Sequence, residues 1–221
     1  MPDQPVEDGR RAVRPPARGA GRAAPALTEQ GKLFVVTGPS GAGKGTLIKA
    51  LLNRRSDLEL AVSATTRPRR PGETDGRDYH FLSDEEFAAR VERGKFLEHV
   101  VYVSGRYGTL RSEVDRIFAA GRSCVLELET AGAKAVQERS RGSVTIFIAP
   151  PSFAELERRL RERATESSGV IEERLEVARG QMEEAEDFRY AVVNDNVDRA
   201  VAELDRIVTK ELAVVGRLSA R

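Results

Sequence analysis

Residues 38–46 combine glycines, one lysine and one threonine at a spacing that suits the binding of phosphate groups. The segment consists of Gly38, Pro39, Ser40, Gly41, Ala42, Gly43, Lys44, Gly45 and Thr46, and it contains the pattern G-x-x-x-x-G-K. Glycines let successive backbone N–H groups face a polyphosphate, and a lysine at this place reaches the β and γ phosphates of a nucleotide. An ordinary glycine-rich turn is the alternative. The apolar run at 33–37 before the segment and the helical pattern after it favour the phosphate site.

The residue after Lys44 departs from the general form of this motif. The general form has Ser or Thr there, and its hydroxyl binds Mg²⁺, whereas this chain has Gly45. Thr46, one residue later, is expected to contact phosphate. The sequence therefore indicates no protein ligand for a metal ion in this loop.

A second group of residues that could bind an anion extends from Ser63 to Glu73 and continues with Gly-Arg-Asp-Tyr at 76–79. Its prolines favour an ordered loop over a helix, and they hold several guanidinium groups close together. Such a cluster suits a second phosphate. A solvated basic loop is the alternative, and it would be preferred if no phosphate loop preceded the cluster.

Along the chain around these residues, short apolar runs alternate with amphipathic segments. Strands are expected at 33–37, 60–63, 123–129, 144–149 and 190–194. A helix follows the phosphate loop, and Ser83–Glu86 and Ser152–Glu155 match the capping box that begins a helix. The pattern predicts a doubly wound α/β fold, in which residues 64–121 form an insertion with a small sheet of its own.

Composition excludes several classes of protein. The chain has 221 residues, of which 40% are hydrophobic and 32% charged, and no apolar run approaches the roughly 20 residues of a membrane helix. The net charge of +1 gives no global field toward nucleic acid or anionic lipid, although only six of the 36 basic residues are lysines. One cysteine and two histidines exclude a disulfide framework and the usual zinc site.

The first 30 residues are rich in Pro, Ala, Gly and Arg and show no helical or strand period. We interpret residues 1–30 as a disordered tail and residues 31–221 as one domain. The start of the chain has no apolar segment of the kind found in secretory signals, so a cytoplasmic location is expected.

Several motifs occur along residues 33–215: T-G-P-S-G-A-G-K, S-x-T-T-R-x-x-R-x-G-E with G-x-D-Y, F-L-E-H, Y-G-T, I-F-I-A-P-P-S with R-L-x-x-R, and V-V-N-D. In these motifs, and over essentially the whole of residues 33–215, the chain resembles the guanylate kinases. The resemblance implies a P-loop NTPase-type parallel sheet flanked by helices, with an inserted GMP-binding subdomain at about 63–121 and a small lid at about 159–174. It also implies Mg²⁺-dependent transfer of the ATP γ-phosphate to GMP or dGMP, in purine nucleotide metabolism and GMP recycling. ATP and GMP are then the partners, without nucleic acid or membrane.

The resemblance also assigns site residues. The positions that surround GMP are Ser63, Arg67, Arg70, Glu73, Tyr79, Glu98, Tyr107, Gly108 and Thr109. The lid arginines that close over ATP are Arg159, Arg163 and Arg174, and Asn194 matches a position near adenine. Glu127 and Glu129 stand where the family usually has an Asp-x-Asp pair on the guanine side, and Glu162 and Ala164 replace two lid glycines.

The residue types suit this assignment. Guanine donates from N1 and N2 and accepts at O6, so Glu98 can accept two hydrogen bonds while the Ser63 hydroxyl donates to O6. The attacking atom is a phosphate oxygen that is already anionic, so no general base is required, and catalysis consists of positioning and charge neutralisation by Lys44, Mg²⁺, Arg67 and the lid arginines.

Two other functions remain open from the sequence. A guanylate-kinase-like interaction module would keep the fold without the chemistry, and an adenylate kinase shares the G-K-G-T loop. The intact Gly43, Lys44 and lid arginines favour an enzyme, and Glu98 with Ser63 favours guanine over adenine.

Overall fold

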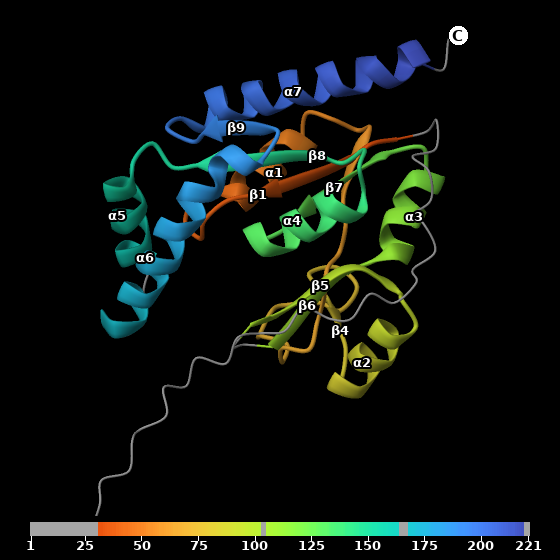
Figure 1. The fold of residues 1–221 in the computed structure, drawn as a ribbon, viewed down its shortest axis with the longest axis horizontal. Coiled ribbons are helices and arrows are strands. Elements are labelled where there is room, and N and C mark those ends of the chain that lie inside the picture. Colours follow the sequence, from red (N-terminus) through yellow and green to blue (C-terminus); the bar gives the residue numbers. More distant parts are fainter. Residues whose placement is uncertain (1–30, 103–104, 164–167, 219–221) are drawn as a thin grey trace, which may run out of the picture.

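The computed structural model describes residues 31–102, 105–163 and 168–218, which form a mixed α/β fold with two sheets (Figure 1). The larger sheet has the order β2-β7-β1-β8-β9, and every neighbouring pair in it is parallel. Its strands are β1 (Leu33–Thr37), β2 (Leu58–Leu60), β7 (Ser123–Glu127), β8 (Val144–Ala149) and β9 (Tyr190–Val193). The predicted parallel sheet flanked by helices is thereby confirmed.

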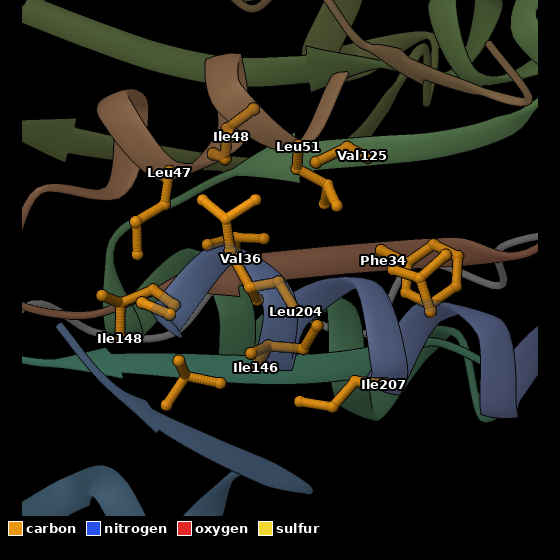
Figure 2. Packing of buried hydrophobic residues seen from close by; sticks show 14 of the residues in the cluster. Phe34, Val36, Leu47, Ile48, Leu51, Val125, Ile146, Ile148, Leu204 and Ile207 are labelled. Atoms are coloured by element: carbon orange, nitrogen blue, oxygen red, sulfur yellow. The ribbon is translucent and has the colours of Figure 1, made fainter. Parts of the chain in front are cut away.

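Helices cover both faces of the larger sheet. Helices α1 (Lys44–Leu52) and α7 (Val197–Leu218) pack on one face, and α3 (Arg111–Ala119) and α4 (Thr130–Arg139) pack on the other. Figure 2 shows the first layer, in which Leu47 of α1 and Leu204 of α7 lie around Val36 of β1. Each such buried side chain contributes about 1.5–3 kcal/mol, so the end of β1 and the start of α1 are held firmly together.

The smaller sheet has the order β4-β3-β6-β5 and belongs to the chain between β2 and β7. Its strands are β3 (Ala64–Thr65), β4 (His80–Phe81), β5 (Phe96–Tyr102) and β6 (Gly105–Leu110). Helix α2 (Asp84–Glu92) covers it, and Phe87 of α2 stacks on Phe96 of β5 with 4.4 Å between ring centroids. This is the small sheet that the sequence predicts within 64–121.

Helices α5 (Phe153–Arg163) and α6 (Ser168–Glu183) pack against each other at one end of the larger sheet, on the left of Figure 1. Leu156 and Leu160 of α5 meet Leu175 and Ala178 of α6 in a separate apolar cluster. A short 3-10 helix, η1 (Glu184–Asp187), then leads into β9.

The predicted strand at 60–63 is wrong. The chain leaves the larger sheet after Ala61, whose N–H donates to the Val125 carbonyl at 2.9 Å. Two residues later the Ser63 carbonyl accepts from His80 N–H at 2.8 Å, which already belongs to the smaller sheet. One apolar run is thus divided between two sheets, and the pattern of residues cannot show where it divides.

Two other predicted strands are shorter than expected. β7 ends at Glu127 instead of 129, and β9 ends at Val193 instead of 194. Backbone pairing nevertheless continues just beyond each end: Leu128 N–H donates to Val36 O at 3.0 Å, and Asn194 N–H donates to Ala149 O at 2.7 Å. The residues after both strands are therefore fixed in position.

One of the two predicted capping boxes is complete. The Ser83 hydroxyl accepts from Glu86 N–H at 3.1 Å, and the Glu86 carboxylate accepts from Ser83 N–H at 2.9 Å. At the start of α5, the Ser152 hydroxyl accepts from Glu155 N–H at 3.2 Å, but the Glu155 carboxylate binds arginines of its own helix instead.

The predicted disordered tail, residues 1–30, lies outside the described residues. Within the three described segments, none of the helices is both long enough and apolar enough to cross a membrane.

Candidate active site

The phosphate loop joins the C-terminal end of β1 to the N-terminus of α1. Gly43 precedes the helix with φ +90°, a backbone conformation that L side chains rarely adopt. The exposed residues of the loop are Ser40, Gly45 and Thr46, which therefore face solvent where a ligand could approach. The helix N-terminus adds a partial positive charge at the same place.

Lys44 folds back over the loop that it follows. Its Nζ donates to the Gly38 carbonyl at 2.7 Å and to the Pro39 carbonyl at 3.1 Å. Burial lowers the pKa of Lys44, while the charges of Glu127 and Glu129 oppose that shift. The ammonium group is therefore held at the loop by weak neutral acceptors, which a phosphate oxygen can replace.

Glu127 ends β7 beside the loop. A Cβ built on Gly45 would be in ordinary contact with Glu127, 3.5 Å from Oε2 and 3.7 Å from Oε1, so this carboxylate lies directly beside the loop. Burial raises the pKa of Glu127, and Lys44 opposes the rise. Among the described residues, no group of three or more His, Cys, Asp or Glu is placed to hold a metal ion.

Glu129 follows at the N-terminus of α4 and is exposed. Burial and the nearby Glu129 carboxylate both raise the pKa of the Tyr102 hydroxyl on β5. Tyr102 also meets Tyr107 edge to face, with 5.6 Å between ring centroids. The second carboxylate of the predicted acidic pair thus faces the smaller sheet, while the first faces the loop.

Arg67 is the most firmly held arginine of the basic loop. It is 9% exposed, its Nη2 donates to Glu73 Oε1 at 2.7 Å, and its Nη1 donates to the Pro68 carbonyl at 2.6 Å. The other Glu73 oxygen accepts from Arg70 N–H at 2.7 Å. The Glu73 interaction raises the pKa of Arg67, and Arg67 in turn lowers the pKa of Glu73. Glu73 therefore orders the loop around one guanidinium group, whereas the Arg70 side chain stays exposed.

Aromatic rings surround that guanidinium group. Its Cζ lies 5.4 Å from the ring centroid of Tyr79 and 5.8 Å from that of Phe81. Tyr79 meets Tyr107 edge to face at 6.0 Å. Arg67, Tyr79 and Tyr107, which the resemblance places around GMP, are therefore neighbours in space.

Glu98 lies on β5 and is 1% exposed. Its Oε1 accepts from the Thr109 hydroxyl on β6 at 2.8 Å, and its buried Oε2 has no hydrogen-bond partner among the described residues. Burial raises the pKa of Glu98, while the bond from Thr109 opposes the rise. A buried carboxylate oxygen without a donor is costly, which is a reason to expect a ligand there.

Glycines make room around Glu98. A Cβ on Gly132, in the first turn of α4, would lie 3.2 Å from Glu98 Oε2, and a Cβ on Gly108 would lie 2.7 Å from the Glu98 carbonyl oxygen. Ser63 is half-buried in the segment before β3. Sequence reasoning missed Gly132 and Tyr102, and the only available signal was that a glycine between two strands can mark a close approach.

The lid residues divide into those near the loop and those farther along the helices. Arg159 on α5 donates to Glu155 Oε1 at 2.8 Å and to the Asn194 carbonyl at 3.2 Å. Arg174 is an exposed residue of α6. The Arg163 side chain and residues 164–167, including Ala164, lie outside the described part of the chain.

Asn194 is 5% exposed, and its side-chain amide donates to the Ala42 carbonyl of the phosphate loop at 2.7 Å. The resemblance places this residue near adenine, whereas in the structure its side chain binds the backbone of the phosphate loop.

The parallel sheet, with its glycine-rich loop and lysine after the first strand, defines a P-loop nucleotide-binding protein.

A family model described as guanylate kinase matches residues 30–211. The guanylate kinase of Thermotoga maritima is 44% identical over 188 residues, which cover 85% of this chain and 91% of that protein. The guanylate kinase of Enterococcus faecalis is 43% identical over 193 residues, covering 87% and 95%. The crystal structure of guanylate kinase from Anaplasma phagocytophilum matches with a TM-score of 0.67 at 31% identity, covering 82% of this chain and 86% of that one. The chain belongs to the guanylate kinase family.

Proposed function

We propose that this chain is an ATP:GMP phosphotransferase, which moves the γ-phosphate of ATP to GMP and gives ADP and GDP. One observation carries the proposal: a phosphate loop occurs in the same molecule as a buried carboxylate, Glu98, whose Oε2 has no hydrogen-bond partner in the described part of the chain. The loop supplies a site for the donor polyphosphate, and the carboxylate supplies an acceptor for the N–H groups of guanine.

Glu98 selects the base. Guanine donates from N1 and N2, so an ionised Glu98 accepts where adenine would present its N1 lone pair. Thr109 holds the other carboxylate oxygen and fixes the orientation of the group. Leaving buried polar groups unpaired can lower the use of the wrong substrate by several orders of magnitude. Ser63 completes the contact by donating to O6, and Glu129 lies on the same guanine side.

The acceptor phosphate binds at Arg67 and Arg70, with the Tyr79 and Tyr107 hydroxyls. Arg67 is already oriented by Glu73, so little side-chain entropy is lost when the phosphate arrives. Gly108 and Thr109 belong to the strand that backs this site.

The phosphate loop binds the donor through its backbone N–H groups and Lys44. On binding, Lys44 exchanges its bonds to the Gly38 and Pro39 carbonyls for bonds to β and γ oxygens. The attacking GMP oxygen is anionic at neutral pH, so the protein contributes alignment and charge stabilisation and no general base.

The residues beside the loop fit the Mg²⁺ that accompanies ATP in such reactions. Carboxylate oxygen is a preferred ligand of Mg²⁺, and the Glu127 carboxylate lies directly beside Gly45 of the loop. Glu127 would hold the ion, directly or through water, together with phosphate oxygens. When bound, the ion neutralises charge on the β and γ phosphates.

The lid contributes charge during the transfer. Arg159, Arg163 and Arg174 approach the transferred group when α5 and α6 close, and closure excludes water that would otherwise hydrolyse ATP. Glu162 and Ala164, in place of family glycines, make the lid stiffer. We assign residues 31–221 to the kinase domain, with dGMP as a second acceptor and a cytoplasmic role in purine metabolism and GMP recycling.

A coupled assay of ADP production tests the proposal by comparing GMP, dGMP, AMP and UMP at fixed ATP and Mg²⁺. We expect turnover with GMP and dGMP and little with AMP or UMP. The enzyme assignment would be overturned by the absence of ADP formation with GMP, as for an interaction module. Equal rates with GMP and AMP would instead overturn the guanine assignment.

A further inference from the structure

Asn194 connects three parts of the nucleotide site. Its backbone N–H donates to the Ala149 carbonyl at the end of β8 at 2.7 Å. Its backbone carbonyl accepts from Arg159 Nη2 on α5 at 3.2 Å. Its side-chain Nδ2 donates to the Ala42 carbonyl in the phosphate loop at 2.7 Å. Because the residue is 5% exposed, this arrangement is part of the protein interior.

The bond to Ala42 fixes the orientation of one peptide unit of the loop. In a trans peptide, the carbonyl of one residue and the N–H of the next point in opposite directions. With the Ala42 carbonyl held toward Asn194, the N–H of Gly43 points away from Asn194. This hydrogen bond between Asn194 and Ala42, called the tie below, thus fixes the direction of the Gly43 N–H donor. Gly43 lies in the segment that the motif assigns to polyphosphate binding.

Gly43 leaves the space that this contact needs. A Cβ at residue 43 would collide with the Asn194 side-chain amide, which is the nearest atom to that position. The glycine therefore serves the approach of Asn194 as well as the positive φ at the start of α1.

We propose that Asn194 is a positioning residue of the phosphate loop, which orients the Gly43 N–H toward the donor nucleotide and anchors Arg159 at the base of the lid. The inference rests on the proposed function, since it takes the loop to be the ATP site. It gives Asn194 a role through the loop backbone instead of a direct contact with adenine.

The role requires a donor at the end of the side chain. An ionised Asp at 194 would set a negative oxygen against the Ala42 carbonyl, whereas a protonated Asp could donate to it. The charged groups near this point are Lys44, which follows Gly43, and the pair Arg159 and Glu155 at the Asn194 carbonyl. Asn194→Asp therefore converts the tie into one that depends on pH.

The experiment measures the dissociation constants of Mg·ADP and of GMP by calorimetry for wild type, Asn194→Asp and Asn194→Ala, from about pH 8 to about pH 6. We expect Asn194→Asp to bind ADP about fivefold or more weakly than wild type at the upper pH and to recover toward wild type at the lower pH. Asn194→Ala should bind ADP more weakly than wild type at both pH values. GMP binding should be unchanged in both variants. Each dissociation constant is divided by the wild-type value at the same pH, which cancels the effect of protonation of the nucleotide itself.

A matched control is Asn196→Asp, the same chemical change at an exposed residue that accepts from Arg199 N–H at 3.1 Å. Its ADP affinity should follow wild type at every pH. If Asn194→Asp does not fold, Asn194→Ser serves instead, because its shorter hydroxyl does not reach Ala42, and weaker ADP binding with unchanged GMP binding is expected.

ADP affinity within about twofold of wild type at the upper pH in the Ala, Asp or Ser variant at residue 194 would overturn the inference. Wild-type protein that binds no Mg·ADP would instead overturn the proposed function, so the two failures are distinguishable.

Discussion

The donor side and the acceptor side of the site are built in different ways. The phosphate loop lies between a buried strand of the larger sheet and a helix whose inner side chains are completely buried. The acceptor side depends on the smaller sheet, where β3 and β4 have two residues each. Side-chain bonds such as Arg67 to Glu73 provide much of the order on that side.

This difference indicates how each half can fail. Packing, backbone bonds and the bond from Asn194 hold the donor loop, so single polar substitutions within the loop itself should alter chemistry more than shape. On the acceptor side, charged groups hold one another, and the same groups are proposed to bind the ligand. Substitutions there should therefore weaken GMP binding both by removing contacts and by loosening their neighbours.

The largest expected effect is on the donor side. Lys44→Ala should lower kcat about a thousandfold, because it removes a positive charge that acts on the transferred group. GMP affinity should stay unchanged. Steady-state kinetics and GMP calorimetry measure the two quantities, and Lys49→Ala, at an exposed lysine of the same helix, is the control. A parallel loss of GMP binding would show that the two sides are not independent.

The next effect concerns the guanine contact. Glu98→Gln should lower kcat/KM for GMP about a hundredfold, because an amide cannot accept from both N1–H and N2–H at one edge as a carboxylate can. Mg·ADP affinity should stay at the wild-type value. Glu92→Gln, at an exposed residue of α2, is the control. An unchanged GMP rate in Glu98→Gln would mean that another residue contacts the base.

The pH dependence of the same contact is expected to be smaller. Burial raises the pKa of Glu98, so the group takes up a proton at a higher pH than an ordinary glutamate and then loses its role as acceptor. The ratio of kcat/KM for GMP between wild type and Glu98→Gln should therefore shrink as pH falls through the raised pKa. Taking the ratio cancels the protonation of GMP. A ratio that is constant with pH, at unchanged stability, would contradict the prediction.

The smallest expected effect is on the loop that carries Arg67. Glu73→Gln removes the charge that orients the guanidinium group, and KM for GMP should rise about fivefold with little change in kcat. Mg·ADP affinity should not move. Asp78→Asn, in the same exposed loop but bonded to Thr74 N–H and Arg77, separates loss of loop order from loss of the Arg67 contact. Equal KM increases in both variants would attribute the effect to loop order alone.

Much of the donor side could be predicted from the sequence. The motif is local, and a strand, a loop and a helix in succession determine where Lys44 lies. The short strands of the acceptor side were harder to predict, because a two-residue strand has no period that a pattern can reveal. The predicted strand at 60–63 was wrong for another reason, because that apolar run is divided between the two sheets.

Contacts between distant residues were beyond sequence patterns. Asn194 and Ala42 are separated by 152 residues, and nothing in either segment indicates that an amide of one binds a carbonyl of the other. The same holds for Gly132 beside Glu98, which depends on how α4 packs against β5. Such placements follow from the tertiary packing of the two sheets.

The single cysteine of the chain has a practical consequence. Cys124 lies in β7 with no exposed surface, and burial raises the pKa of its thiol, so it is a poor nucleophile in the folded protein. Cysteines introduced on the exposed surfaces of α2 and α5 would therefore react with maleimide dyes while the native thiol stays unmodified. Fluorescence energy transfer between the two dyes would then follow the distance between the smaller sheet, which α2 covers, and the lid helix α5. No native residue other than the two labelled ones would need to be changed.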